Sequence, residues 1–193
     1  RSGQLMNGNY TAEFESWLAK KNHSKYAITC HSGTHALEII AGYYHQQLEK
    51  EKPTVVIPSF TYVATANAFQ RSGWHVHLAD TDKYGVISQE KQISGVSGVY
   101  DCLMGFGGRR PWAHATYQES YGVIVDGAQH WLECGGNVGS GMAISFDPTK
   151  NLNASGNGGA IVTNDHQLYL FASTYRDNFK PYFADMGTNS KMS

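Results

Sequence analysis

Short apolar runs bounded by polar residues or glycine recur along the whole chain of 193 residues. The runs are rich in valine, isoleucine and aromatic residues, which is typical of strands buried in a sheet. We expect seven strands, at residues 26–30, 54–57, 74–78, 99–103, 123–125, 143–146 and 160–163.

Between these runs, apolar residues return at helical spacing, which predicts amphipathic helices covering a mostly buried sheet. The three groups are Phe14/Trp17/Leu18, Leu37/Ile40/Ala41/Tyr44/Leu48 and Leu168/Leu170/Phe171/Tyr175. Alternation of strand and helix indicates one α/β domain, a three-layer α/β/α arrangement around a mostly parallel seven-stranded sheet. Ligands of such sheets bind beyond the carboxyl ends of the strands, where Ser32, Ser59, Asp80 and Asp126 are expected in one crevice.

Composition narrows the possible functions. The chain is 41% hydrophobic and 16% charged, with a formal net charge of −1 and no basic run, so no nucleic-acid or anionic membrane partner is expected. No apolar stretch approaches the roughly 20 residues of a membrane span, and the start does not resemble a signal peptide.

The cysteines and histidines give no sign of a metal site. Cys30, Cys102 and Cys134 are scattered, without disulfide-framework or metal-ligand spacing, so we expect three free thiols in a reducing cytoplasm. His75 and His77 share one face of a predicted strand, but no third ligand of recognisable spacing accompanies them.

Lys150 is the candidate nucleophile. It lies in Ser145-Phe146-Asp147-Pro148-Thr149-Lys150, between an apolar strand and a glycine cluster. A lysine amine desolvated in a pocket loses its proton readily and can form a Schiff base with a carbonyl, although most lysines are solvated surface charges.

Asp126 is a second candidate, because it ends another apolar strand. Its carboxylate could keep a pyridine nitrogen protonated. Alternatively, Asp126 forms a turn or caps a helix, which are common roles of aspartate at the end of a strand.

Ser32-Gly33-Thr34 follows a strand and opens a helix. Its backbone N–H groups and the Thr34 hydroxyl could receive a phosphate at the positive end of that helix. On these residues alone a simple helix cap is the preferred explanation, because serine and threonine are preferred caps.

Four ordered segments, 31–37 (HSGTHAL), 58–65 (PSFTYVAT), 123–129 (VIVDGAQ) and 145–152 (SFDPTKNL), resemble the DegT/DnrJ/EryC1/StrS family of pyridoxal-phosphate-dependent sugar aminotransferases. The resemblance covers nearly the whole chain and implies the large domain of a fold-type-I transferase over residues 1–193. It also implies that an initial helix and a smaller carboxy-terminal domain of the family are missing. Asn157 departs from the family pattern, which has an acidic residue there.

The resemblance also implies a role for each residue in holding pyridoxal 5′-phosphate. Lys150 forms the Schiff base and moves protons, and Asp126 pairs with the pyridine nitrogen. Tyr62 stacks on the ring in preference to Phe60, which would then belong to the core. The cofactor phosphate is contacted by Ser32, Gly33, Thr34 and Ser145, and the ring hydroxyl by Gln129. Asn189 reaches across a dimer interface to the phosphate of the cofactor bound in the partner subunit.

The implied function is transfer of an amino group from an amino acid, with glutamate as the expected donor, to a nucleotide-linked ketosugar in a homodimer with shared active sites. Some relatives carry histidine at the lysine position and act as dehydratases, so Lys150 favours transamination. Two alternatives stay open. One is a catalytically incomplete or regulatory cofactor-binding fragment, and the other is a dinucleotide-binding domain, although the expected Gly-x-Gly-x-x-Gly turn is lacking.

Overall fold

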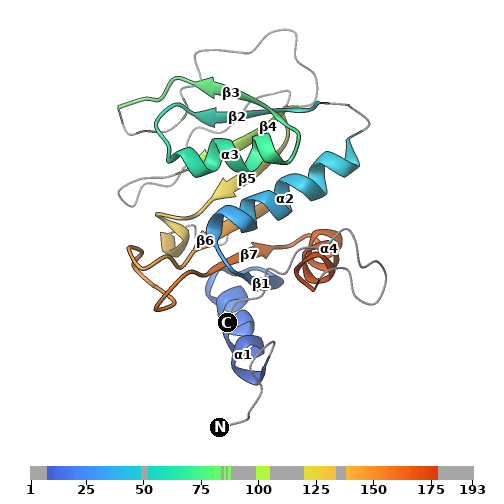
Figure 1. Cartoon of the computed structure of the whole chain (residues 1–193), viewed down its shortest axis with the longest axis vertical. Coiled ribbons are helices and arrows are strands. Elements are labelled where there is room, and N and C mark those ends of the chain that lie inside the picture. The colour runs from blue at the N-terminus through green and yellow to red at the C-terminus, as the bar shows by residue number, and fades with distance from the viewer. Residues whose placement is uncertain are drawn as a thin grey trace.

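The computed structural model describes residues 8–48, 52–83, 85, 87, 99–104, 120–133 and 138–177. A seven-stranded sheet forms its centre, with the strand order β1-β7-β6-β5-β4-β2-β3 (Figure 1). The strands are β1 (Tyr26–Cys30), β2 (Thr54–Pro58), β3 (His75–Ala79), β4 (Val99–Met104), β5 (Ser120–Asp126), β6 (Gly141–Ser145) and β7 (Gly159–Thr163).

The sheet is mixed with a parallel majority. Strands β3, β2, β4, β5 and β6 run parallel to one another, whereas β7 is antiparallel to both β6 and β1. Two antiparallel steps restore the original direction, so β1 points the same way as β6. The carboxyl ends of β1, β2, β3, β5 and β6 therefore share one edge of the sheet, and the segments that follow them meet there.

Four helices are described: α1 (Asn9–Lys21), α2 (Gly33–Gln47), α3 (Val63–Arg71) and α4 (His166–Arg176). Two of them begin at side-chain caps. The Ser32 hydroxyl accepts the N–H of His35 ahead of α2, and the Asp165 carboxylate accepts two N–H groups ahead of α4. No helix within the described ranges combines the length and the apolar character needed to span a membrane.

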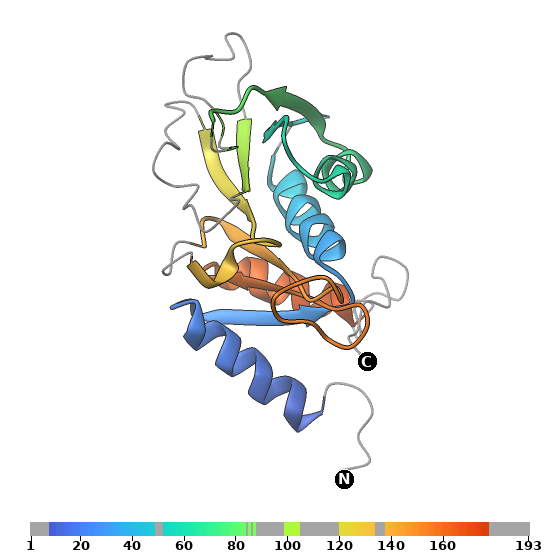
Figure 2. The same cartoon turned by 90° about the vertical axis from the view of Figure 1, so that its left-hand side faces the viewer.

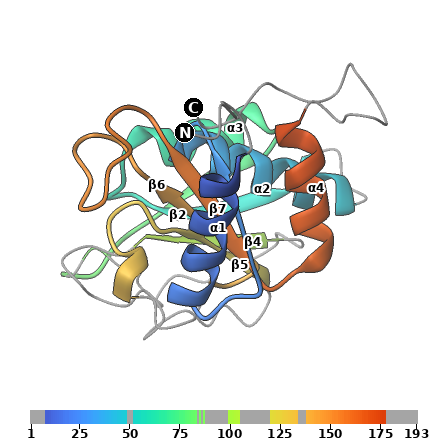
Figure 3. The same cartoon turned by 90° about the horizontal axis from the view of Figure 1, so that it is seen from below.

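The helices lie on both faces of the sheet. Side chains alternate between faces along a strand, so Ile28 and Ile161 pack with α2, α3 and α4, while Ala27 and Val162 pack with Leu18 of α1. Figure 2 shows α2 and α3 together on one side of the sheet, and Figure 3 shows α1 crossing in front of β7. This arrangement confirms the α/β fold with three layers.

Glu15 fastens α1 to the edge strand β1. Its Oε1 atom accepts the Thr29 N–H at 2.8 Å, the Thr29 hydroxyl at 2.7 Å and Nη1 of Arg176 at 2.7 Å. An edge strand exposes unpaired backbone groups, and the half-buried Glu15 carboxylate, which accepts one of them, closes this part of the edge. The same carboxylate joins α1 to the end of α4.

Strand positions were predicted better than strand ends. All seven predicted strands are present, but β3 begins one residue late and β6 ends at Ser145, with Phe146 buried beyond it. The predicted helices correspond to α1, α2 and α4. Helix α3 was not predicted, because its sequence VATANAFQR offers only a short apolar face.

Candidate active site

The amino end of α2 lies against the ends of β6 and β7. A Cβ atom added to Gly33 would meet the Cβ of Ser145 at 2.7 Å, and one added to Gly159 would meet the carbonyl carbon of Ser32 at 2.2 Å. Only glycine permits backbones to approach so closely. Residues predicted to hold a phosphate, Ser32, Gly33 and Ser145, are therefore brought together, and we call them with Thr34 the phosphate cradle.

The first turn of α2 supplies N–H groups that have no acceptor within the helix, including those of Gly33 and Thr34, since helix geometry leaves the first turn unpaired. The Ser32 hydroxyl accepts the N–H of His35 at 3.1 Å, so Ser32 caps the helix as the structural alternative predicted. This capping leaves the Ser32 hydroxyl hydrogen available as a donor. The cap and the cradle are thus compatible.

Asp126 is a buried carboxylate at the end of β5, with 5% of its surface exposed. Its Oδ2 atom accepts the Thr65 hydroxyl at 2.8 Å, and its Oδ1 atom accepts the N–H of Ala128 at 3.1 Å. Burial raises the pKa of Asp126, while these two hydrogen bonds and the positive charge of Lys150 act in the opposite direction. A cation beside this carboxylate would stabilise its charged form.

Lys150 lies in the connection between β6 and β7. Its N–H donates to the Asp147 carbonyl at 2.9 Å, and the Asp147 carboxylate accepts both the N–H and the hydroxyl of Thr149. Two further backbone bonds close the connection, from Phe146 N–H to the Gly158 carbonyl and from Ala154 N–H to the Phe146 carbonyl. Lys150 is half-buried in this turn, within electrostatic range of Asp126.

A shallow polar hollow connects Lys150 with the segment after β5. It is lined by Ala128, Gln129, His130, Trp131, Leu132, Lys150 and Asn151. Gln129 is exposed on this hollow, three residues beyond Asp126. The structure thus brings Lys150, Asp126 and Gln129 to one place at the carboxyl edge of the sheet.

Tyr62 and Phe60 both lie on the surface. Tyr62 is 73% exposed and Phe60 is 61% exposed, so the prediction that Phe60 packs in the core is wrong. The chain leaves the sheet at Pro58, and a hydrogen bond from Ser59 N–H to the Ala79 carbonyl holds the following segment at the edge rather than over the core. The stacking role of Tyr62 stays a prediction.

Several predictions concern residues or side chains outside the described set, namely Asn189, Cys134 and the side chain of Cys102. Cys30 is a free, buried cysteine as expected. Among the described residues, no three or more His, Cys, Asp or Glu side chains gather as metal ligands would.

Sequence reasoning missed two residues of the site. Thr65 of α3 is buried and holds Asp126, and its own hydroxyl is 2.9 Å from the hydroxyl of Thr61. Thr61 precedes α3, which begins at Val63, so no regular helical spacing marked the two threonines as neighbours. Gly159 was noted only as part of a glycine cluster, and its close approach to Ser32 depends on sheet pairing that the sequence does not reveal.

Comparison with known protein families shows to which family this chain belongs. The family model described as the DegT/DnrJ/EryC1/StrS aminotransferase family matches residues 1–96 and 113–193. The chain belongs to this family. Its fold is accordingly that of the fold-type-I transferases that use pyridoxal phosphate, as the resemblance of four short segments had implied.

Similar proteins support this assignment. A pleiotropic regulatory protein of Geobacillus stearothermophilus is 29% identical over 100% of this chain and 55% of its own length. The UDP-2-acetamido-2-deoxy-3-oxo-D-glucuronate aminotransferase of Pseudomonas aeruginosa is 32% identical over 87% of this chain and 49% of its own. The solved structure of NtdA from Bacillus subtilis with bound pyridoxamine phosphate is 25% identical, has a TM-score of 0.80, and is matched over 99% of this chain and 46% of its own. The chain therefore spans about half the length of these relatives.

The described residues fit pyridoxal phosphate, which family members use. The cradle offers N–H and hydroxyl donors at a place where a Cβ on Gly33 or Gly159 would collide with the backbone or Ser145. Asp126 is a buried carboxylate whose charge would be stabilised by a protonated ring nitrogen. Lys150 provides an amine on the same edge of the sheet.

Proposed function

We propose that the protein to which this chain belongs transfers an amino group from an amino acid, with glutamate as the donor, to the keto group of a nucleotide-linked sugar. The observation that carries the proposal is that Lys150 lies within electrostatic range of a buried carboxylate, Asp126, at the same sheet edge as the phosphate cradle. The named activity of the Pseudomonas aeruginosa relative, an aminotransferase of a UDP-linked oxo sugar, supports the choice of substrate.

Each proposed role follows from the chemistry of a side chain. The donors of Ser32, Gly33, Thr34 and Ser145 bind the cofactor phosphate, and Asp126 keeps the ring nitrogen protonated. When bound, pyridoxal phosphate supplies an electron sink that stabilises negative charge on the substrate carbon.

Lys150 is proposed to carry the proton. Its amine removes a proton from the carbon of the donor amino acid and returns it elsewhere, which is general base and general acid work by one group. Tyr62 covers one face of the ring, and Gln129 contacts the ring hydroxyl. Asn189 is proposed to reach the cofactor phosphate of a partner subunit in a homodimer, and a cytoplasmic location is proposed with it.

Borohydride reduction in the presence of pyridoxal phosphate tests the central assignment. Reduction fixes the cofactor on the lysine that holds it, and peptide mass mapping then identifies that lysine. We expect the label on Lys150 and its loss in Lys150→Ala. Lys25→Ala, which removes an exposed lysine, serves as the matched control and should keep the label. An unlabelled Lys150 in a folded sample would refute the assignment.

A regulatory function is the second candidate. It is favoured by one observation, the match of the whole chain to a protein named as a pleiotropic regulator. Addition of glutamate to the cofactor-loaded protein separates the two candidates. Conversion of the cofactor to its amine form, followed by absorbance, supports the aminotransferase, whereas a loaded protein that leaves the cofactor unchanged supports the regulatory alternative.

A further inference from the structure

Thr65 of α3 connects two groups that the proposed function places around the cofactor ring. Its hydroxyl donates to Oδ2 of Asp126 at 2.8 Å, and its backbone N–H donates to the Tyr62 carbonyl at 3.0 Å. Thr65 is 1% exposed and Asp126 is buried, so water does not compete for the hydrogen bond between hydroxyl and carboxylate. One residue is therefore bonded both to the carboxylate proposed to face the ring nitrogen and to the residue proposed to cover the ring.

Thr61 fixes the direction of this hydrogen bond. An ionised carboxylate only accepts, so Thr65 uses its single hydroxyl hydrogen on Asp126. The hydroxyl of Thr61, 2.9 Å from that of Thr65, is then the donor in the contact between the two threonines. The hydrogen bonds run from Thr61 to Thr65 and from Thr65 to Asp126, and bonds arranged in such a chain strengthen one another.

The Asp126 carboxylate is held at both of its oxygens. Oδ1 accepts the N–H of Ala128 at 3.1 Å, while Oδ2 accepts the Thr65 hydroxyl. These donors belong to different parts of the chain, the turn after β5 and helix α3, so together they fix the plane of the carboxylate. Burial raises the pKa of Asp126, and the Thr65 hydroxyl is the strongest of the groups that oppose burial. Each oxygen can accept a second hydrogen bond, so a protonated ring nitrogen would meet a carboxylate that is already oriented.

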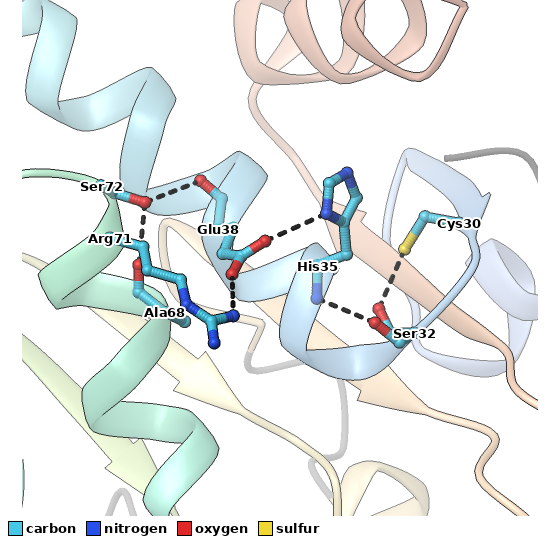
Figure 4. A network of polar contacts seen from close by, with 7 residues as sticks. All are labelled: Cys30, Ser32, His35, Glu38, Ala68, Arg71 and Ser72. Atoms are coloured by element: carbon cyan, nitrogen blue, oxygen red, sulfur yellow. Dashed lines mark hydrogen bonds and ion pairs between the residues drawn. The ribbon is translucent and has the colours of Figure 1, made fainter. Parts of the chain in front are cut away.

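Helix α3 is itself joined to α2, the helix that begins at the phosphate cradle (Figure 4). At the carboxyl end of α3, Nη1 of Arg71 donates to Oε1 of Glu38 at 3.0 Å. The Ser72 hydroxyl, just beyond α3, lies 3.3 Å from the Glu38 carbonyl oxygen. Contacts near both ends of α3 thus hold it between Asp126 and the helix of the cradle.

We propose that Thr65, oriented by Thr61, is a positioning residue that holds the Asp126 carboxylate toward the ring nitrogen of the cofactor. The inference rests on the proposed function, since it concerns the same carboxylate and the same ring. Thr65 acts through Asp126 and takes no part in proton transfer. A carboxylate that has lost this support must be ordered by the ligand itself, which weakens binding about three- to tenfold for one side chain.

Two ligands separate this role from a general effect on the fold. Pyridoxamine 5′-phosphate carries the ring nitrogen and has no aldehyde to react with Lys150. An analogue with a C–H group in place of that nitrogen keeps the phosphate, the amine and the ring hydroxyl. Calorimetry gives both dissociation constants, and the constant of the analogue divided by that of pyridoxamine 5′-phosphate is called the nitrogen preference.

Four proteins are compared first. Besides the unmodified chain, these are Thr65→Val, which replaces the hydroxyl by a methyl group of similar size, Thr65→Ser, which keeps the hydroxyl, and the matched control Thr174→Val. Thr174 lies in α4, and its hydroxyl contacts carbonyl groups of that same helix. We expect the nitrogen preference to fall about three- to tenfold in Thr65→Val and to keep its unmodified value in Thr65→Ser and Thr174→Val. A purely structural defect would weaken both ligands equally and leave the preference unchanged.

Thr61→Val provides an independent test. Because Thr61 is half-buried, this variant should fold even where Thr65→Val does not. It removes the group that donates to Thr65, and the weaker hydrogen bond from Thr65 to Asp126 should lower the nitrogen preference about twofold.

An unchanged nitrogen preference in Thr61→Val, and in Thr65→Val where that protein folds, would overturn the positioning role and leave the proposed function standing. An equal fall in Thr65→Ser and Thr65→Val would also overturn it, because the hydroxyl would then not be the cause. Equal affinity of the unmodified chain for both ligands, or no binding of either, would refute the proposed role of Asp126 and this inference together.

Discussion

Gly159→Ala should disturb the cradle directly. The added Cβ would lie 2.2 Å from the carbonyl carbon of Ser32, 2.4 Å from its oxygen and 2.6 Å from the nitrogen of Gly33. All three are backbone atoms, so no side chain can rotate away. The shortest contact must open by about 0.8 Å to reach even 3.0 Å, the lower limit for real Cβ contacts.

Neither partner can move freely. Gly159 pairs with Cys30 of β1 on one side and with Ser145 of β6 on the other, so displacement of β7 strains both ladders. Overpacking of this kind costs about 1–3 kcal/mol, and we expect the upper half of that range because backbone must shift. The reduced freedom of the unfolded chain offsets roughly 0.4–1 kcal/mol. A net loss of about 2 kcal/mol of unfolding free energy follows.

Urea denaturation of Gly159→Ala, with Gly156→Ala as the matched control, measures this loss. A Cβ on Gly156, three residues away in the same connection, has nothing within 4 Å, and the backbone there is not left-handed. The control should unfold at the same midpoint as the unmodified chain or slightly above it. Binding of pyridoxamine 5′-phosphate should weaken only in Gly159→Ala. Equal midpoints for the two variants would show that the close approach of β7 and α2 does not exist in solution.

Two further perturbations test the buried charges. Burial raises the pKa of Asp126, so in the cofactor-free chain this group favours folding below its unfolded pKa of about 4 and loses that contribution as pH rises through its folded value. Asp126→Asn should therefore flatten the fall in stability above about pH 4, and an unchanged slope in urea titrations would contradict it. Glu15→Ala removes the shorter of two carboxylate contacts of Arg176, which is 11% exposed, and leaves only Asp177 at 3.6 Å, so it should cost about 2 kcal/mol, whereas the exposed Glu13→Ala should cost under about 0.5 kcal/mol. Similar thermal midpoints for these two variants would contradict the role of Glu15.

Several strands could be predicted because they are buried on both faces. β2, β6 and β7 are buried at all five positions, which produces continuous apolar runs. The antiparallel placement of β7 could not be predicted in the same way. Pairing direction depends on which strands become neighbours, and a continuous apolar run such as Gly159–Thr163 is compatible with parallel and with antiparallel pairing.

The sequence predicts which segments form the candidate site, but it does not predict which side chains contact one another there. Lys150, Asp126 and Ser32 follow apolar runs, and their shared edge follows from strand direction. The hydrogen bond from Thr65 to Asp126 joins residues 61 positions apart, so no local pattern could reveal it. Phe60 was misplaced for the opposite reason, because an aromatic residue next to a strand is buried in most proteins but here lies beyond the sheet edge.

Because β6 and β7 are consecutive strands that pair with each other, the turn that holds Lys150 is fixed by residues close to it in sequence. The lysine lies in the loop of a hairpin that pairs Ser145 with Gly159, so its turn can form as soon as residues 141–163 have been synthesised. Short loops close at small entropic cost, whereas bringing Ser32 to Ser145 requires closure of a far longer segment. The turn that holds Lys150 thus depends on contacts close in sequence, whereas the cradle depends on the long-range pairing of β1 with β7.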